Sequence, residues 1–264
     1  ALSLLISFHQ FEKAIDILNT VENREEKIDL FIHNVILPVV FNNLDTTFMD
    51  FIMKTDENLE KTRFLWDAAI DFFKKKNMPQ GLILALQIEN KLEDAAIVGF
   101  ESLKSCVSFL GEVTLLGNII INLKTSINFR RNNCEPKENP ENNEQVETTH
   151  KIPKSPSITE PIQLSNVVIN ESKSYNEIKE YLNIAELQLS VSKFCIEKSI
   201  PFTHDYEIFS TEKGAESVAA LLFINKQYDL MNELKDTMKL SKTEILCKAS
   251  ELVCNESPEK VIKF

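Results

Sequence analysis

Glycine is the residue whose scarcity most restricts the folds open to this chain. The 264 residues include five glycines, against roughly 18 at the usual frequency of ~7%. All-β folds, dinucleotide-binding turns and phosphate-binding loops need glycine where the backbone takes a positive φ or passes close to a ligand. Leu, Ile, Lys, Glu and Asn dominate the composition instead. The sequence therefore predicts an all-α protein.

Apolar residues recur at spacings of three and four along most of the chain, which is the period of a helix packed on one side. Pro38 falls inside one such pattern and should kink or end that helix. Trp66 lies off the apolar stripe of its helix, so it marks either a second apolar face or an exposed ring. Ser241 and Glu244 have the spacing of a capping box. The predicted helices cover residues 2–8, 11–20, 24–40, 44–53, 59–76, 79–89, 92–103, 107–129, 175–199, 211–225 and 228–238, with a further one after Ser241.

A similar junction between helices occurs at three places, near Gln10, Lys91 and Gln227. Each has a polar residue, then a bulky apolar residue, then acids that suit the first turn of a new helix. Ala95 and Ala96 are small enough to let two helices approach closely. Helix, tight turn and helix is the unit of an α-solenoid. We therefore expect an irregular α-solenoid of antiparallel helix hairpins, of the tetratricopeptide or armadillo kind, with a compact helical bundle as the alternative.

The chain divides into three parts by composition. Residues 131–162 contain no Leu, Phe, Tyr or Trp but five of the nine prolines, so this stretch cannot bury enough apolar area to fold. The predicted organisation is an N-terminal helical block over 1–130, a disordered linker rich in acids and proline over 131–170, and a C-terminal helical block over 171–264. Both ends of the sequence fall in helical patterns, so we expect a piece of a longer polypeptide that continues beyond residue 264.

The net charge of −11 argues against nonspecific binding to nucleic acid or anionic lipid, since both need a Lys/Arg surface. The clearest basic run, Lys74–Lys76, sits at a predicted helix C-terminus, where cations complement the helix dipole. No apolar run is long enough to span a bilayer. We expect no direct membrane insertion.

No constellation of residues points to catalysis or to a cofactor. The five cysteines form no CxxC pair, which disfavours a disulfide framework or a zinc site, and Cys247 and Cys254 are expected to be buried core thiols. The histidines, His9, His33, His150 and His204, lie far apart in sequence. His204–Asp205 is expected to be a solvated loop pair. Glu93 and Asp94 are adjacent on a helix, so their side chains diverge and fit first-turn charges better than a catalytic pair. We expect no enzyme activity, no metal and no cofactor.

Several segments, taken in order, resemble the C-terminal region of the spastizin family of very large FYVE-finger proteins. The longest is FLWDAAIDFFKKKNMPQGLILALQIENKLEDAAIVGFESL at Phe64–Leu103. The others are Phe31–Pro38, the AELQL helix from Ala185 to Phe194, Ile208–Phe209 and Val218–Met231. The linker does not align. The cysteine pairs of a FYVE zinc finger are absent, so any phosphoinositide binding would belong to a finger outside these residues.

The resemblance implies a noncatalytic scaffold. Proteins of the spastizin family associate with spatacsin and with adaptor protein complex five on late endosomes and lysosomes. They act in membrane trafficking, lysosome reformation and autophagy, and are linked to cytokinesis, which implies a peripheral location on these organelles and at the centrosome or midbody. Two other readings stay open. One is an α-solenoid of another trafficking coat, including the tail of spatacsin itself, and the other is a purely structural spacer.

Overall fold

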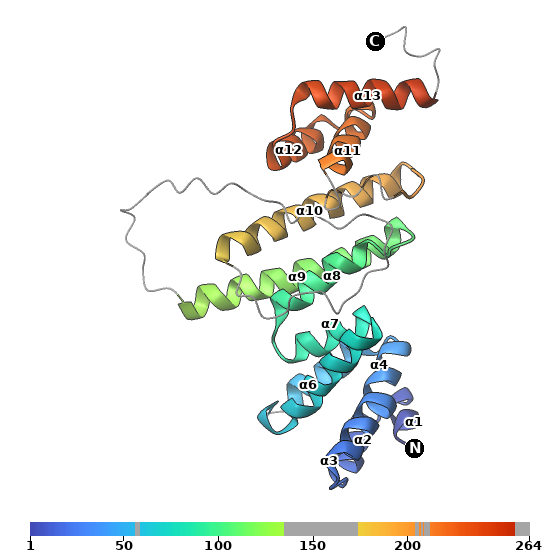
Figure 1. Cartoon of the computed structure of the whole chain (residues 1–264), viewed down its shortest axis with the longest axis vertical. Coiled ribbons are helices and arrows are strands. Elements are labelled where there is room, and N and C mark those ends of the chain that lie inside the picture. Colours follow the sequence, from blue (N-terminus) through green and yellow to red (C-terminus); the bar gives the residue numbers. More distant parts are fainter. Residues whose placement is uncertain (56–58, 135–173, 204–205, 207, 209–211, 257–264) are drawn as a thin grey trace. The chain divides into compact units, whose positions relative to one another are not determined.

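A computed structural model describes residues 1–55, 59–134, 174–203, 206, 208 and 212–256, and over these residues the protein is helical with no strand (Figure 1). The predicted all-α class is confirmed. The helices are α1 (Leu2–Ser7), α2 (Phe11–Asn19), α3 (Arg24–Leu30), η1 (Phe31–Ile36), α4 (Leu37–Phe41), α5 (Asp45–Thr55), α6 (Leu59–Lys76), α7 (Pro79–Ile88), α8 (Leu92–Leu103), α9 (Phe109–Cys134), α10 (Tyr175–Glu197), α11 (Glu212–Ile224), α12 (Tyr228–Met238) and α13 (Lys242–Glu256).

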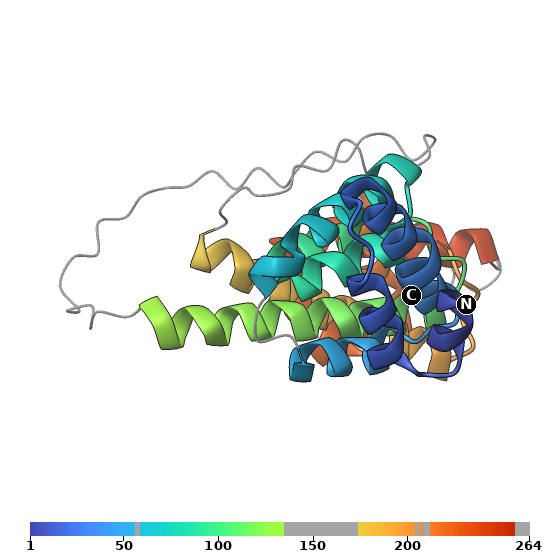
Figure 2. The same cartoon turned by 90° about the horizontal axis from the view of Figure 1, so that it is seen from below.

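The helices group into two compact units. Among described residues, the first unit runs from Ala1 to Gly99 and the second begins at Phe100. In the first unit, α1 packs on α2, η1 and α4, and α6 packs on α7, with α1–α4 (blue) grouped together in both views (Figure 2). In the second unit, α9 packs along α10, and α11 packs on α12 and α13. Across the described part of the chain, no helix is both long enough and apolar enough to cross a membrane.

Among the described residues, the same short joint occurs at seven helix ends, and at five of them the next helix follows without further loop residues. A non-glycine residue takes the left-handed conformation with φ between 53° and 59°, and the N–H of the following residue donates to the carbonyl five residues earlier. These five pairs are His9–Gln10, Asn43–Leu44, Asn77–Met78, Asn90–Lys91 and Lys226–Gln227, with N···O distances of 2.8, 2.9, 3.0, 2.8 and 2.8 Å. This hydrogen bond closes a Schellman motif. The next helix begins at the residue after each pair, so the predicted helix breaks at Gln10, Lys91 and Gln227 are confirmed.

The joints explain how a chain with few glycines turns so sharply. Left-handed backbone costs an ordinary L-residue roughly 1–2 kcal/mol, and Asn tolerates it better than most. None of the glycines described here has a positive φ, and Asn occupies three of the seven left-handed positions among the described residues. First-turn acids follow the predicted joints, as expected: Glu12 in α2, Glu93 and Asp94 in α8, and Asp229 in α12.

Pro38 does not end its helix, contrary to one expectation from the sequence. The chain stays helical from Arg24 to Phe41, and a π-helical stretch, η1, ends two residues before the proline. Proline has no N–H and its ring crowds the carbonyl four residues earlier. The wider π turn relieves this crowding locally, so the helix continues. Pro79, in contrast, opens α7 in its first turn as predicted.

Trp66 belongs to the core of the first unit, so its position marks a second apolar face of α6. Its side chain is 1% exposed. The ring meets Phe31 edge-on, with centroids 4.9 Å apart, and lies 6.5 Å from Phe48. The lysines at the end of α6, Lys74–Lys76, occupy the last helical turn as predicted.

The core of the second unit is built by α10, α11 and their neighbours. Its centre contains Val191, Phe194, Val218, Leu222 and Leu234, all buried. The capping box at the start of α13 is confirmed: Glu244 N–H donates to Ser241 Oγ at 3.1 Å, and Ser241 N–H donates to Glu244 Oε2 at 3.0 Å.

The predicted linker lies almost entirely outside the described residues, which resume at Ser174. Its first residues are an exception, because α9 continues to Cys134 rather than ending before Arg131. The organisation into three blocks, predicted from composition, stays a prediction. In the structure, α9 packs beside α10, although the predicted linker separates them in sequence (Figure 1).

Two helical glycines provide a matched test of packing. A Cβ at Gly81 would lie within 2.6 Å of Cδ1 and Cζ of the fully buried Phe73, whereas a Cβ at Gly117 would meet nothing within 4 Å. We expect Gly81→Ala to lower the free energy of unfolding by about 1–3 kcal/mol. Gly117→Ala should raise it by about 0.5–1 kcal/mol, because alanine favours the helix. Urea melts of both variants measure whether the two changes in the free energy of unfolding have opposite signs. Equal changes would contradict the close packing of Gly81 against Phe73.

Candidate interaction surface

The polar residues singled out in the sequence do not gather into one site. His9 occupies a helix joint, and His33 lies on η1 with its Nδ1 3.0 Å from Asp29 Oδ1. Glu93 and Asp94 sit in the first turn of α8, as predicted. His150, His204 and Asp205 lie outside the described residues. Within the part of the chain that the structure describes, no group of His, Cys, Asp and Glu could hold a metal ion.

The cysteine prediction for α13 is wrong. Cys247 and Cys254 share one helix face, but that face is exposed. The buried side of α13 carries Ile245 and Ala249. Cys247 is two residues from Ile245, a rotation of about 200° at 3.6 residues per turn, and therefore points away from the core.

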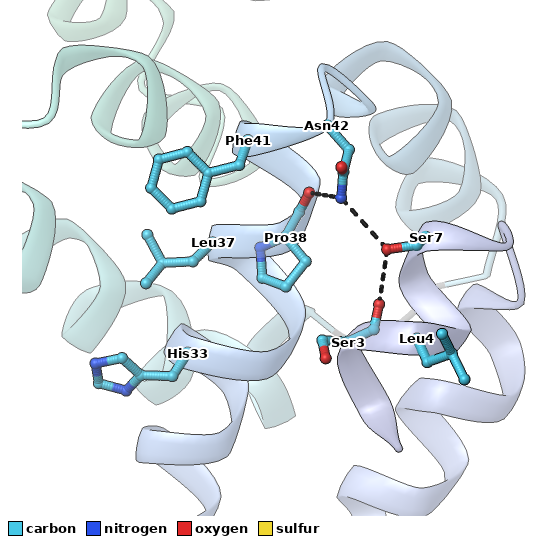
Figure 3. Close-up of a pocket in the computed structure, with 8 residues that line it drawn as sticks. All are labelled: Ser3, Leu4, Ser7, His33, Leu37, Pro38, Phe41 and Asn42. Atoms are coloured by element: carbon cyan, nitrogen blue, oxygen red, sulfur yellow. Dashed lines mark hydrogen bonds between the residues drawn. The ribbon is translucent and has the colours of Figure 1, made fainter.

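A shallow groove of about 410 Å³ lies between α1 and the helix formed by η1 and α4 (Figure 3). Two of its polar side chains, Asn42 and Ser7, bond within the groove. Asn42 Nδ2 donates to the Pro38 carbonyl at 2.8 Å and to Ser7 Oγ at 3.4 Å, and Ser7 Oγ donates to the Ser3 carbonyl at 3.0 Å. Leu4 and Phe41, also in the lining, are more than 60% exposed. The groove therefore offers an apolar surface rather than a reactive centre.

Charged groups surround the joint between α7 and α8. The side chain of Glu89 is 6% exposed, and its Oε2 lies 3.7 Å from Arg63 Nε and 3.8 Å from Lys91 Nζ. Burial raises the pKa of the Glu89 carboxyl; Lys91 opposes the shift, Asp67 adds to it and Arg63 opposes it. The ionised carboxylate is thus less favourable in the folded chain than in the unfolded one.

The raised pKa of Glu89 predicts the sign of a pH effect on stability. The folded state holds the Glu89 proton more tightly than the unfolded state does. Glu89 therefore contributes most to folding stability below the ordinary glutamate pKa, and this contribution is lost as pH rises through the pKa of the folded state. We expect Glu89→Gln to remove this dependence and to stabilise the chain at neutral pH. The gain should stay below about 1 kcal/mol, because the two long ion pairs are lost as well. Urea melts of both proteins between pH 4 and 8 measure this; a steeper pH dependence in the variant would contradict it.

A buried polar cluster in the second unit is centred on Gln188 of α10, which is fully buried. Its Nε2 donates to Glu112 Oε1 at 2.7 Å and lies 3.2 Å from the Tyr206 carbonyl, and its Oε1 accepts the N–H of Ile208 at 2.8 Å. A flipped amide would place oxygen against two oxygens, so these partners fix its orientation. One side chain therefore ties α9, α10 and the segment before α11 together.

The thiol next to this cluster is unsuited to act as a nucleophile. Burial, reinforced by the negative charge of Glu112, raises the pKa of Cys195 to about 12. The thiol therefore stays protonated at neutral pH, whereas nucleophilic cysteines react as thiolates. The cluster is best explained as a structural tie. No local pattern predicts this cluster, because Gln188 and Glu112 are 76 residues apart.

The long helix α9 carries an apolar face that the other described residues of the second unit leave exposed. Leu110, Ile121 and Phe129 are 70%, 62% and 57% exposed. Between them on the same side lie Thr114, Gly117 and Thr125. Thr114 Oγ1 donates to the Leu110 carbonyl at 3.0 Å and Thr125 Oγ1 to the Ile121 carbonyl at 2.8 Å, so both hydroxyls already bond within the helix. We call these six residues the α9 face.

The α9 face has the dimensions and chemistry of a helix-binding surface. It extends over about 28 Å at 1.5 Å per residue, and no charged residue occurs from Val113 to Leu123 on any side of the helix. Fully burying each large side chain is worth about 1.5–3 kcal/mol before the costs of association. Since a charge buried without a partner is costly, the matching surface must also be uncharged. A partner helix with an uncharged apolar face would bury these side chains without burying a charge.

Comparisons with known proteins give no relative: no family model, no curated protein and no solved structure matches this chain.

Proposed function

We propose that this chain is a noncatalytic scaffold: an irregular α-solenoid segment that binds a helical protein partner through the α9 face. Following the resemblance described above, the segment acts in a spastizin-like protein together with a spatacsin-like partner and adaptor protein complex five. The proposed setting is late endosome and lysosome trafficking, including lysosome reformation and autophagy, and cytokinesis. The α9 face is the observation that carries the binding role.

Two features support the solenoid part of the proposal. The recurring left-handed joint ends one helix and lets the next begin after two residues, and a stack of helix hairpins needs such short connections. In addition, the contacts between α9 and α10 run in opposite order along the two helices. Glu112, earlier in α9, meets Gln188, and Lys124, later in α9, meets Glu186, which precedes Gln188 in α10. This order is that of an antiparallel pair.

The noncatalytic part rests on how the polar groups are used. The side-chain amide and one hydroxyl of the groove bond to each other and to backbone carbonyls. The buried thiol in the second unit is protonated, and Gln188 bonds to a carboxylate and to backbone groups. Each of these groups supports the fold, which fits a scaffold better than an enzyme.

Direct binding tests the proposal. The chain, immobilised on a biosensor, would be exposed to purified helical segments of a spatacsin-like protein and, separately, to the subunits of adaptor protein complex five. We expect saturable binding of at least one of them. Absence of binding by all of them would contradict the proposed partners and favour a structural spacer. Binding only by another trafficking coat protein would keep the scaffold role and reassign the family.

A further inference from the structure

The side chains of the α9 face follow the same order from either end of the face. A large apolar residue, Leu110 or Phe129, stands at each end, and a threonine, Thr114 or Thr125, lies four residues inside each end. In a two-fold symmetric contact, each copy presents the same surface to the other. A second α9, laid antiparallel on the first about such an axis, would place Leu110 of each copy opposite Phe129 of the other. The two kinds of threonine would face each other in the same way.

The middle of the α9 face holds a gap and a side chain that fits it. A Cβ at Gly117 would meet nothing within 4 Å among the described residues, whereas Ile121, one turn later, is 62% exposed. The same two-fold axis brings Ile121 of one copy to within about one residue, or ~1.5 Å along the helix, of Gly117 of the other. Glycine disfavours a helix interior. A second helix packed against it gives this glycine a use, because a side chain of one helix can enter the hole between residues of the other.

The charged residues of α9 do not oppose this pairing. The helix carries Glu112, Lys124, Arg130 and Arg131. In the register set by Leu110 and Phe129, the residues of the second copy at the same levels are Ile127, Leu115, Phe109 and Ser108. Lys124 is also paired within its own chain, with its Nζ 2.7 Å from Glu186 Oε1. Like charges therefore do not face each other across the two helices, which removes a common obstacle to self-association.

The two threonines can enter a helix interface without leaving a polar group unpaired. Thr114 Oγ1 and Thr125 Oγ1 each donate to a backbone carbonyl of α9 itself. A buried hydroxyl is costly when it has no partner, and these two keep theirs. Each position along the α9 face thus accepts the residue that a second copy brings to it.

We propose that the α9 face binds a second copy of this chain in an antiparallel, two-fold symmetric dimer, in which Ile121 of each copy fills the gap at Gly117 of the other. The dimer rests on the α9 face as a binding surface, as the proposed function does, but requires none of the partners proposed above. Few large side chains carry the contact, so the dimer is weak and depends on concentration. A second copy and a helical partner cannot occupy one face together, so dimerisation withholds the face from the partner.

Sedimentation equilibrium of the full 264-residue chain on its own, at loadings from about 5 µM to 500 µM, measures the dimer. We expect a reversible equilibrium between monomer and dimer. Gly117→Leu fills the gap that Ile121 needs, so it should weaken dimerisation at least tenfold. Association driven only by exposed apolar surface would instead become stronger, because leucine adds such surface. A chain that stays monomeric throughout, or a Gly117→Leu variant that dimerises as tightly as the wild type, would overturn the proposal.

Three double variants at Thr114 and Thr125 test the antiparallel register. Both residues are exposed, and they lie about 16 Å apart along one helix, so new charges pair between copies rather than within one. Thr114→Glu with Thr125→Lys sets opposite charges across each contact, whereas glutamate at both positions, or lysine at both, sets like charges there. We expect the Glu/Lys variant to dimerise at least tenfold more tightly than either of the others.

The two like-charge variants change the net charge in opposite directions. If net charge alone controlled association, the Glu/Lys variant would fall between them. That ranking, or equal dimerisation of all three variants, would contradict the register, since in a parallel pair the Glu/Lys variant would also set like charges against each other.

Results on the dimer are separable from results on the proposed partners. The chain alone reports the dimer, and the biosensor reports binding of the spatacsin-like segments and the adaptor subunits. Partner binding by a chain that stays monomeric would keep the scaffold role and remove the dimer. A dimer in a chain that binds none of these partners would do the reverse.

Discussion

Replacing Gln188 with glutamate should lower the free energy of unfolding of the second unit by about 3–5 kcal/mol at neutral pH. The substitution keeps the shape of the side chain but exchanges its donor for an acceptor. In the wild type, the Gln188 amide nitrogen donates to the Glu112 carboxylate and lies beside the Tyr206 carbonyl. A carboxylate at this fully buried position would face both of these oxygen groups without a proton to donate. Like charges and unpaired acceptors in a low-dielectric site are among the most destabilising changes a single substitution can make.

A second substitution separates this cause from simple loss of packing. In the Gln188→Glu, Glu112→Gln double variant, the donor and acceptor exchange sides, so part of the lost stability should return. Urea melts of the two single variants and the double variant measure the coupling. A Gln188→Glu variant within about 1 kcal/mol of the wild type would show that the cluster does not hold α9 and α10 as described.

Ala96→Asp should destabilise the first unit by about 3–5 kcal/mol, and Ala95→Asp by a similar amount. Both alanines are fully buried in α8. An aspartate there would bury a charge without a partner and would need space in a packed interior. The effect should shrink as pH falls, because protonation of the new carboxyl removes the charge.

Ala96→Ser provides the matched control, since serine adds a polar hydroxyl to a side chain close to alanine in size and carries no charge. Its cost should be clearly smaller than that of aspartate. Thermal melts monitored by circular dichroism compare the variants, with hydrogen exchange locating the loss in α8. Melts of both aspartate variants that match the wild type would contradict the packing of this helix.

Local features of the fold were predictable because they depend on neighbours in sequence. The joint at Asn90–Lys91 follows from a polar residue that tolerates left-handed backbone and from first-turn acids, and it is present. The same joint at Asn43 and Asn77 was not predicted, although an Asn at the end of an apolar helical pattern could have indicated it. The helix does not end at Pro38, because a π-helical stretch before the proline lets it continue; the alternative expectation of a kink there stays a prediction.

Features that depend on distant parts of the chain could not be predicted. Gln188 lies in an apolar helix pattern, and glutamine is usually exposed, so nothing local identifies its partners. Cys247 and Cys254 share a face as expected, but which face α13 buries depends on its packing against α11. The α9 face is visible in sequence as a helix apolar on more than one side, yet only the fold tells which side stays open. The solenoid arrangement and the family resemblance stay predictions.

The proposed binding role of the α9 face is tested most directly by a matched pair of surface variants. Leu110→Glu combined with Ile121→Glu puts two charges on this face, whereas Leu246→Glu changes an equally large, half-exposed residue on α13. All variants should fold, because the altered side chains are exposed. Affinity for a spatacsin-like helical segment, measured by isothermal titration calorimetry, should fall at least tenfold, or about 1.4 kcal/mol, for the α9 variant. The Leu246 variant should bind like the wild type. Unchanged affinity of the α9 variant would contradict the account.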